Sequence, residues 1–313
     1  MTAVGSRPKV CLLVGSERSG STLLARLLGR QQGFIDVGEL KNLAFAWHDP
    51  LWRCGCGQLW RQCSFWADVI ARTPQLAVLA EVDERGRSTL RQQTKLRRIF
   101  GLWRAARGTP APASWASILE SLYTEVAEVS GQRVMIDGSK APGYGLLASQ
   151  VADIDLYVLH LVREVRAVVF SWSRDRPSVS GAAREAMPPR SWVATSLRWT
   201  AENVVAALLV RRALRPHRYL RLDYEELVEH PEATVATITR FLGEAPSRTE
   251  PIPESPQSAS HSMSGNVGRF DTGPIRLRRD DEWRSELPAV VGTVAYLIGV
   301  PARLVFRLSS RAS

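Results

Sequence analysis

Several features that mark whole classes of proteins are missing from this sequence. It has no stretch of 18 or more uninterrupted apolar residues, the minimum for a membrane-spanning helix. Its first residues, MTAVGSRPKV, contain no apolar signal region ahead of a cleavage site. We see no internal repeat, recognition helix or zinc-finger spacing. These absences favour a cytoplasmic protein with no nucleic-acid partner.

Cysteine is also scarce, with four in 313 residues. Cys54, Cys56 and Cys63 lie close together in the segments CGCG and CSFW. Three thiols do not fill a tetrahedral zinc shell, and no close histidine completes one, although His48 is near in sequence. A disulfide is disfavoured in a reducing compartment. We therefore expect a structural role for these cysteines and no metal.

The bulk composition is that of a folded α/β domain with an excess of positive charge. Hydrophobic residues make up 45% and charged residues 23% of the chain. The net charge of +10 suits an anionic ligand or an anionic surface. We expect a single domain over residues 1–313, with a helical insertion at about 71–115.

Near the C-terminus, residues 287–306 are the most apolar part of the chain. Gly292, Gly299, Pro301 and Arg303 interrupt the run. We expect one terminal helix that either packs on the domain or contacts a membrane surface peripherally.

The most informative stretch is KVCLLVGSERSGSTLLARLLG, residues 9–29. A short apolar run, typical of a strand buried on both faces, leads into a loop with two glycines. Leucines at helical spacing follow. The order strand, loop, helix directs backbone N–H groups at one point and predicts an anion site. Gly15 permits the sharp exit from the strand, and Gly20 allows close backbone approach to a ligand.

What this loop lacks is the lysine of nucleotide triphosphatases. Ser21 and Thr22 follow Gly20, where a P-loop has lysine and then serine or threonine. The cation comes earlier, at Arg18. The segment Arg18-Ser19-Gly20-Ser21-Thr22 resembles the 5′-phosphosulfate loop of sulfotransferases that use 3′-phosphoadenosine 5′-phosphosulfate (PAPS). The resemblance implies that residues Ser16, Glu17, Arg18, Ser19, Gly20, Ser21 and Thr22 bind the cofactor.

Gly38-Glu39 follows a second predicted strand, Phe34 to Val37. Residues at the carboxyl ends of parallel strands face the ligand crevice. The position resembles the catalytic glutamate of the tyrosylprotein-type branch of that family, which implies that Glu39 accepts a proton from the acceptor. The alternative is a solvent-exposed carboxylate or a residue that starts a helix.

Lys140 lies at the end of a third predicted strand, residues 133–137, two positions before Pro142. The segment is similar to the Lys-x-Pro element of the same relatives, where lysine reaches the bridging region of the phosphosulfate. A flexible ammonium there stabilises the charge that develops as the S–O bond breaks. The alternative is a surface lysine in a loop.

Arg163 ends a fourth predicted strand, and Ser171 follows eight residues later on a predicted helix. This spacing resembles the 3′-phosphate motif of PAPS sulfotransferases. An arginine fork suits a phosphate, and serine adds a hydroxyl donor. Residues 174–190 are expected to form a loop over the site. A later Gly/Arg-rich loop implies a further 3′-phosphate contact at Arg269, with Arg276 in reserve.

The resemblance implies a three-layer, P-loop-like α/β fold with a parallel sheet, and transfer of a sulfuryl group from PAPS to a hydroxyl or amine. Glu39, Arg18 and Lys140 would be catalytic, and no metal would be needed. The acceptor class stays open between a small molecule, a carbohydrate and a lipid. Two alternatives remain: a P-loop kinase, which needs the absent lysine and Mg²⁺, and a non-catalytic anion-binding protein on the same fold.

Overall fold

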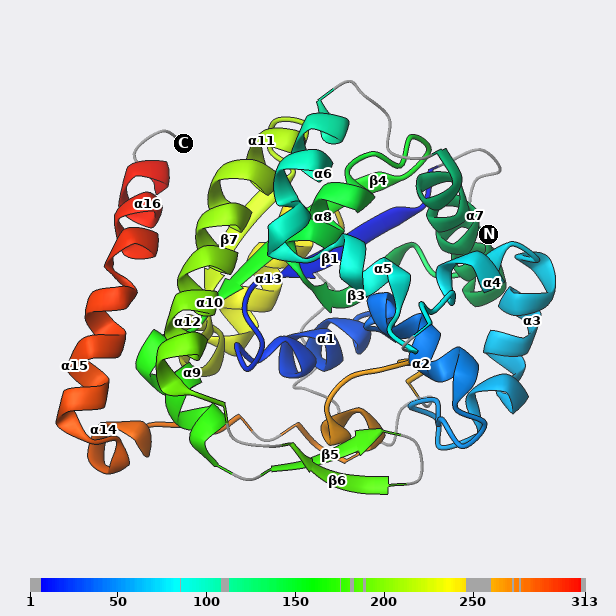
Figure 1. The fold of residues 1–313 in the computed structure, drawn as a ribbon. Helices are drawn as coiled ribbons and strands as arrows, with labels where there is room; N and C mark the ends of the chain where they lie inside the picture. The colour runs from blue at the N-terminus through cyan, green and yellow to red at the C-terminus, as the bar shows by residue number, and fades with distance from the viewer. Residues whose placement is uncertain are drawn as a thin grey trace.

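The computed structural model describes residues 7–84, 86–107, 113–174, 176–180, 183–187, 190–245, 260–271, 273–275 and 277–310. Its centre is a five-stranded, all-parallel sheet in the order β2-β3-β1-β4-β7 (Figure 1). The strands are β1 (Lys9–Val14), β2 (Phe34–Gly38), β3 (Val134–Lys140), β4 (Asp155–Val162) and β7 (Tyr219–Asp223). The predicted α/β architecture is confirmed.

Alternate residues of β1 face opposite sides of the sheet, as the two-residue period of a strand requires. Leu12 belongs to one hydrophobic cluster and Leu13 to another, and both are fully buried. The Leu12 face packs against α7 (Ala113–Ser130) and α8 (Pro142–Ala148). The Leu13 face packs against α1 (Ser21–Gly29), α12 (Tyr224–Glu229) and α13 (Pro231–Phe241). Helices therefore cover both faces of the sheet, which explains the uninterrupted apolar run in β1.

Strand register brings the ends of three strands together. Val14 pairs with Lys140, and the N–H of Gly15 donates to the Lys140 carbonyl at 2.9 Å. Gly38 pairs with Asp137 on the other side of β3. The residues that follow β1, β2 and β3 must therefore meet at one edge of the sheet.

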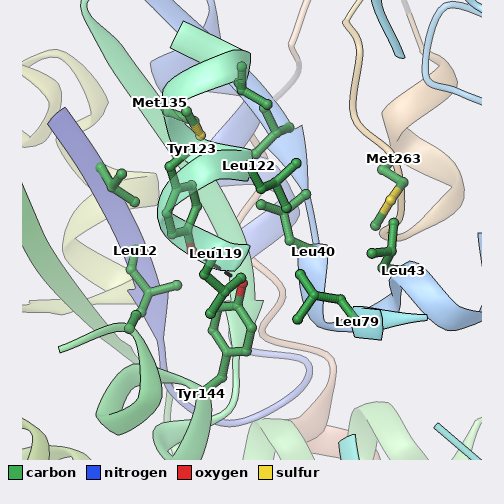
Figure 2. Packing of buried hydrophobic residues seen from close by; sticks show 14 of the residues in the cluster. Leu12, Leu40, Leu43, Leu79, Leu119, Leu122, Tyr123, Met135, Tyr144 and Met263 are labelled. Carbon is green, nitrogen blue, oxygen red and sulfur yellow. Dashed lines mark hydrogen bonds between the residues drawn. The ribbon is translucent and has the colours of Figure 1, made fainter. Parts of the chain in front are cut away.

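Between β2 and β3 the chain forms mostly short helices. They are η1 (Leu40–Asn42), α2 (Leu43–His48), η2 (Trp60–Gln62), α3 (Ser64–Arg72), α4 (Leu76–Leu79), α5 (Thr89–Gln93), η3 (Leu96–Arg98) and α6 (Ile99–Ala106). The segment expected as an insertion supplies buried side chains to the main core, among them Leu76, Leu79 and Leu90. Figure 2 shows Leu79 in this core with Leu40 and Leu43 from the first two of these helices.

The remaining elements follow β4. They are α9 (Val165–Ser173), β5 (Arg176–Ser180), β6 (Ala183–Met187), α10 (Trp192–Val205), a π-helical turn η4 (Ala206–Val210), α11 (Arg211–Ala213), η5 (Val267–Phe270) and α14 (Trp283–Glu286). The expectation of a loop over residues 174–190 is wrong in part, because β5 and β6 pair as an antiparallel hairpin. This hairpin lies apart from the central sheet (Figure 1).

The expected single C-terminal helix is two helices, α15 (Ala289–Ile298) and α16 (Val300–Ser310). They break at Gly299 and bend by 46°. Ala295, Ala302 and Phe306 are buried against Trp199 of α10. Within the described residues, no single helix has the length and apolarity to span a membrane, whereas the bent α15–α16 pair together reaches that threshold.

Candidate active site

The loop after β1 turns sharply before it starts α1. Gly15 has φ +148°, and a Cβ there would come within 2.4 Å of the Leu161 carbonyl oxygen. Arg18 has φ +69°, a left-handed conformation that is uncommon outside glycine. Gly20 precedes α1, whose first turn has no acidic residue and no side-chain cap. The first-turn N–H groups and the helix dipole thus present positive charge at the loop, as predicted.

The role of Gly20 differs from the sequence-based expectation. Its φ is +91°, and an added Cβ would lie 2.4 Å from the ring of Tyr224 at the start of α12. The missing side chain therefore makes room for an aromatic ring. That ring also lies under the guanidinium of Arg163, 4.6 Å from its centroid.

Glu39 and Lys140 meet at the edge where β2 and β3 end. The Nζ of Lys140 donates to Oε1 of Glu39 at 2.5 Å, and the Nζ of Lys41 lies 3.6 Å from Oε2. All three side chains are largely buried. Burial by itself raises the pKa of the Glu39 carboxyl, but the charges of Lys140 and Lys41 outweigh it and lower the pKa. Glu39 is therefore ionised at neutral pH and can accept a proton.

A buried network holds Lys140 in place. Lys140 has φ +61°, and its neighbour Ser139 donates through both N–H and Oγ–H to Asp137. Tyr123 donates to the other Asp137 oxygen at 2.8 Å, and Tyr123 and Tyr144 share a hydrogen bond. Figure 2 shows Tyr123 and Tyr144 among the buried hydrophobic residues of the main core. Burial raises the pKa of Asp137 to about 6.

Arg163 lies where β4 ends and is itself buried. One guanidinium nitrogen donates to the Arg18 carbonyl at 3.1 Å, which ties the two loops together. Another donates to the Asp280 carboxylate at 2.9 Å. Ser171 on α9 is buried and lines the same cavity as Arg163. Asp280 was not anticipated from the sequence.

These groups line one cavity of about 820 Å³ at the carboxyl ends of the strands. The predicted site residues that line this cavity are Glu17, Arg18, Gly20, Ser21, Thr22, Glu39, Lys140, Arg163 and Ser171. Ser16 and Ser19 of the same loop are buried and do not line this cavity. The Ser19 hydroxyl has no hydrogen-bond partner among the described residues. The size is within the usual range for a small-molecule site.

Glu17 introduces a negative charge into this basic loop. Its carboxylate pairs with Arg190 at 2.8 Å and lies 3.6 Å from Arg198. Burial opposes ionisation, but Lys41, Arg198 and Arg190 overcome it and lower the Glu17 pKa to about 2. The side chain of Glu17 therefore organises cations, and only its backbone is suited to an anion.

Arg18 is placed by an aromatic ring. Its guanidinium lies 4.8 Å from the Trp172 ring centroid, and that of Arg190 lies 3.6 Å from it. Arginine remains protonated at any relevant pH, so its contribution here is electrostatic.

The loop that contains Gly265 and Gly268 reaches the cavity, but Arg269 of the same loop does not line it. Residues Gly265 and Gly268 line the cavity, whereas Arg269 is buried beside a neighbouring cavity of about 420 Å³. Arg269 donates to the Gly265 carbonyl at 2.6 Å and packs on Phe270. The geometry does not support the expected contact of Arg269 with a 3′-phosphate. The reserve candidate Arg276 lies outside the described residues.

Lys41, Tyr224 and Asp280 are cavity residues that sequence reasoning missed. Lys41 follows Glu39 closely at the same strand end, and Tyr224 directly follows β7. Their positions just after strands could therefore have identified both as candidate site residues. No comparable pattern marks Asp280, which lies 117 residues from its partner Arg163.

The expectation that no histidine joins the three cysteines is wrong. Nδ1 of His261 lies 3.3 Å from the Cys63 sulfur and 3.8 Å from the Cys54 sulfur. The chain path, rather than sequence proximity, brings this histidine to the cluster.

A glycine loop before a helix N-terminus, an all-parallel sheet and a second basic strand end define a P-loop-like α/β protein with a charged crevice. The chain belongs to the sulfotransferase family, whose model matches residues 11–247. This membership supports sulfuryl transfer as its activity.

Two solved structures illustrate the likeness. The sulfotransferase domain of the olefin synthase from Synechococcus PCC 7002 is 21% identical, with 96% of each chain covered and a TM-score of 0.51. A sulfotransferase domain from the curacin biosynthetic pathway is 20% identical over 95% of this chain and 98% of that one, with a TM-score of 0.49. The first comparison shows a shared fold. No curated protein matches the chain.

Proposed function

We propose that this protein transfers the sulfuryl group of PAPS to a hydroxyl or amine of an acceptor. The observation that carries the proposal is the Glu39–Lys140 pair, held at 2.5 Å in the same cavity as the glycine loop and Arg163. A carboxylate base, the lysine paired with it and two separate basic strand ends then share one crevice.

The loop after β1 would bind the 5′-phosphosulfate, and Arg163 with Ser171 would bind the 3′-phosphate. Backbone N–H groups at the start of α1 suit the first anion, and the buried guanidinium suits the second. Asp280 already accepts one Arg163 hydrogen bond, so binding at that end requires Asp280 to share or release the fork.

Transfer would proceed by in-line attack of the acceptor oxygen or nitrogen on sulfur. The new bond to sulfur forms as the bond from sulfur to the bridging phosphate oxygen breaks, and adenosine 3′,5′-bisphosphate leaves. Glu39 takes the acceptor proton, which neutralises its carboxylate. Lys140 then loses its ionic partner and is available to offset charge on the bridging oxygen, together with Arg18.

The acceptor would enter beside Glu39 along an aromatic wall. Phe45 and Trp52 line the cavity and stack with centroids 6.5 Å apart. Arg91, from the segment expected as an insertion, packs over Phe45 and lines the same cavity. An acceptor with an apolar or ring-shaped part fits this wall, and an anionic group on it would meet Arg91.

Calorimetric binding of adenosine 3′,5′-bisphosphate and of ATP, each with and without Mg²⁺, tests the donor. We expect tight, metal-independent binding of the bisphosphate. A preference for ATP with Mg²⁺ would contradict the proposal and favour a kinase. Bisphosphate binding without transfer of labelled sulfuryl from PAPS to any acceptor in a broad panel would instead favour a non-catalytic binding protein.

A further inference from the structure

Four potential metal ligands converge outside the cavity described above. The ligand atoms of Cys54, Cys56, Cys63 and His261 all lie within 4.8 Å of one another. Cys54 and Cys56 precede η2 and Cys63 directly follows it, whereas His261 comes from the segment after residue 260. All the cysteines of the cluster are free thiols.

Three of the separations between ligand atoms are close to those of a tetrahedral zinc site. Zn–S bonds of about 2.3 Å and Zn–N bonds of about 2.0–2.1 Å place tetrahedral ligand atoms roughly 3.5–3.8 Å apart. The sulfurs of Cys56 and Cys63 are 3.7 Å apart, and Nδ1 of His261 is 3.3 Å from Cys63 and 3.8 Å from Cys54. Three sulfurs and one imidazole nitrogen form a soft donor set that favours zinc over magnesium or calcium.

The surroundings orient the ligands. Cys54 and Cys63 are fully buried, and the His261 ring stacks on Phe65 with centroids 4.7 Å apart. Trp66 donates to the His261 carbonyl at 2.8 Å. The buried guanidinium of Arg269 interacts electrostatically with Cys54 and can offset the net negative charge of three thiolates and Zn²⁺.

A disulfide accounts for only part of this arrangement. The sulfurs of Cys56 and Cys63 are 3.7 Å apart, and a bond between them would leave Cys54 and His261 facing each other without a role. We propose that Cys54, Cys56, Cys63 and His261 bind one Zn²⁺ ion, and that this ion fastens the segment 260–268 to the catalytic edge of the sheet.

The contacts of that segment show what the ion would hold. The Gly55 N–H donates to the Ser262 carbonyl, and the Met263 N–H donates to Val37 in β2. The Glu39 N–H then donates to the Ser264 carbonyl at 3.0 Å. Figure 2 shows Met263 packed in the main core with Leu43. The segment thus runs from His261 directly to the proposed base.

Zinc binding would close a long loop, because His261 lies 198 residues from Cys63. Fixing such distant segments removes conformational freedom from the unfolded chain. Binding deprotonates the three thiols and releases their protons to solvent. The ion would be structural, since all four ligand positions come from the protein.

The test is metal analysis of tag-free protein purified under reducing conditions without chelator. We expect about one zinc per chain by mass spectrometry, and Co²⁺ reconstitution should give the intense visible bands of tetrahedral thiolate coordination. Cys56→Ser and His261→Ala should each lose most of the metal. Cys11→Ala and His48→Ala, which change a cysteine and a histidine outside the cluster, should retain it.

A second measurement protects against variants that fold poorly. Removal of zinc from the wild-type protein with a chelator should lower its melting temperature by several degrees, and added Zn²⁺ should restore it. The proposal is overturned if the wild-type protein binds neither Zn²⁺ nor Co²⁺, if Cys56→Ser and His261→Ala keep full metal content, or if Cys56 and Cys63 are found as a disulfide. None of these outcomes depends on the identity of the donor or acceptor.

Discussion

The loops after β1 and after β4 present positive charge to the same cavity by different means. After β1, the charge comes from backbone N–H groups at the start of α1 and from the guanidinium of Arg18, in a loop whose residues Gly15, Arg18 and Gly20 have positive φ. After β4, it comes from the side chain of Arg163, which is shared between the Arg18 carbonyl and the Asp280 carboxylate. The first arrangement is local in sequence, and the second depends on a distant residue.

The two loops therefore suit different tasks: the loop after β1 suits precise positioning of a ligand, and Arg163 after β4 suits adjustable binding affinity. Backbone donors are held in place by the turn and by the start of α1, so the β1 loop suits the reacting group, whose position must be exact to a fraction of an ångström. When a guanidinium is paired with a carboxylate, a single substitution can strengthen or weaken its affinity for an anionic ligand. We therefore expect changes near β1 and β2 to alter turnover, and changes at Arg163 and Asp280 to alter binding.

The largest expected effect is from Glu39→Gln. Loss of the base should reduce turnover by about 10²–10⁴-fold. Affinity for adenosine 3′,5′-bisphosphate should change little. Single-turnover transfer from labelled PAPS to an acceptor identified by screening measures the first quantity, and calorimetry measures the second. Unchanged turnover would remove Glu39 as the base.

The pH dependence of the wild-type enzyme sharpens this prediction. Because Lys140 and Lys41 lower the pKa of Glu39, its carboxylate stays ionised below the ordinary value of 4.5. Activity that depends on ionised Glu39 should therefore persist as pH falls to that value. In Lys140→Met the Glu39 pKa should rise, and the acidic fall in kcat should move to higher pH.

Arg163→Ala should produce the next largest effect, on affinity. Hydrogen bonds to charged groups contribute about 1.5–3 kcal/mol, so bisphosphate binding should weaken by about 10–150-fold. Arg166→Ala is the matched control, because Arg166 pairs with Glu164 and stacks on Trp283 outside the cavity. Equal losses in both variants would show a general effect of charge or folding.

The smallest expected effect is a gain. Asp280→Asn removes the carboxylate that competes for the Arg163 fork, and bisphosphate affinity should rise a few-fold, well below the about tenfold change that corresponds to 1.4 kcal/mol. Asp281→Asn is the control, since Asp281 is exposed and pairs with Arg279 and Arg284. A loss of affinity in Asp280→Asn would show that Asp280 orients Arg163 for binding.

Much of the fold and part of the site could be predicted from local pattern. The apolar run before Gly15 and the leucines after Gly20 identified β1 and α1, and buried runs identified β2, β3 and β4. Because carboxyl ends of parallel strands share one edge, the positions of Glu39, Lys140 and Arg163 after predicted strands were enough to place them together. Their roles in catalysis stay predictions.

Local sequence pattern could not predict contacts between segments that are distant in the chain. The sequence shows Arg269 in a basic loop, but only the path of residues 260–270 decides that it lines the neighbouring cavity and not this one. The same path brings Met263 under β2 and His261 to three cysteines that lie about two hundred residues earlier.

The sequence by itself determined the first four strands of the sheet, the helix after β1 and the strand-end positions of the charged groups, because hydrophobic period and glycine conformation act over a few residues. The tertiary structure decided which charges are paired and which histidine lies beside the three cysteines. Those outcomes follow from packing between elements, where Asp280 reaches Arg163 and His261 reaches Cys63 across most of the chain.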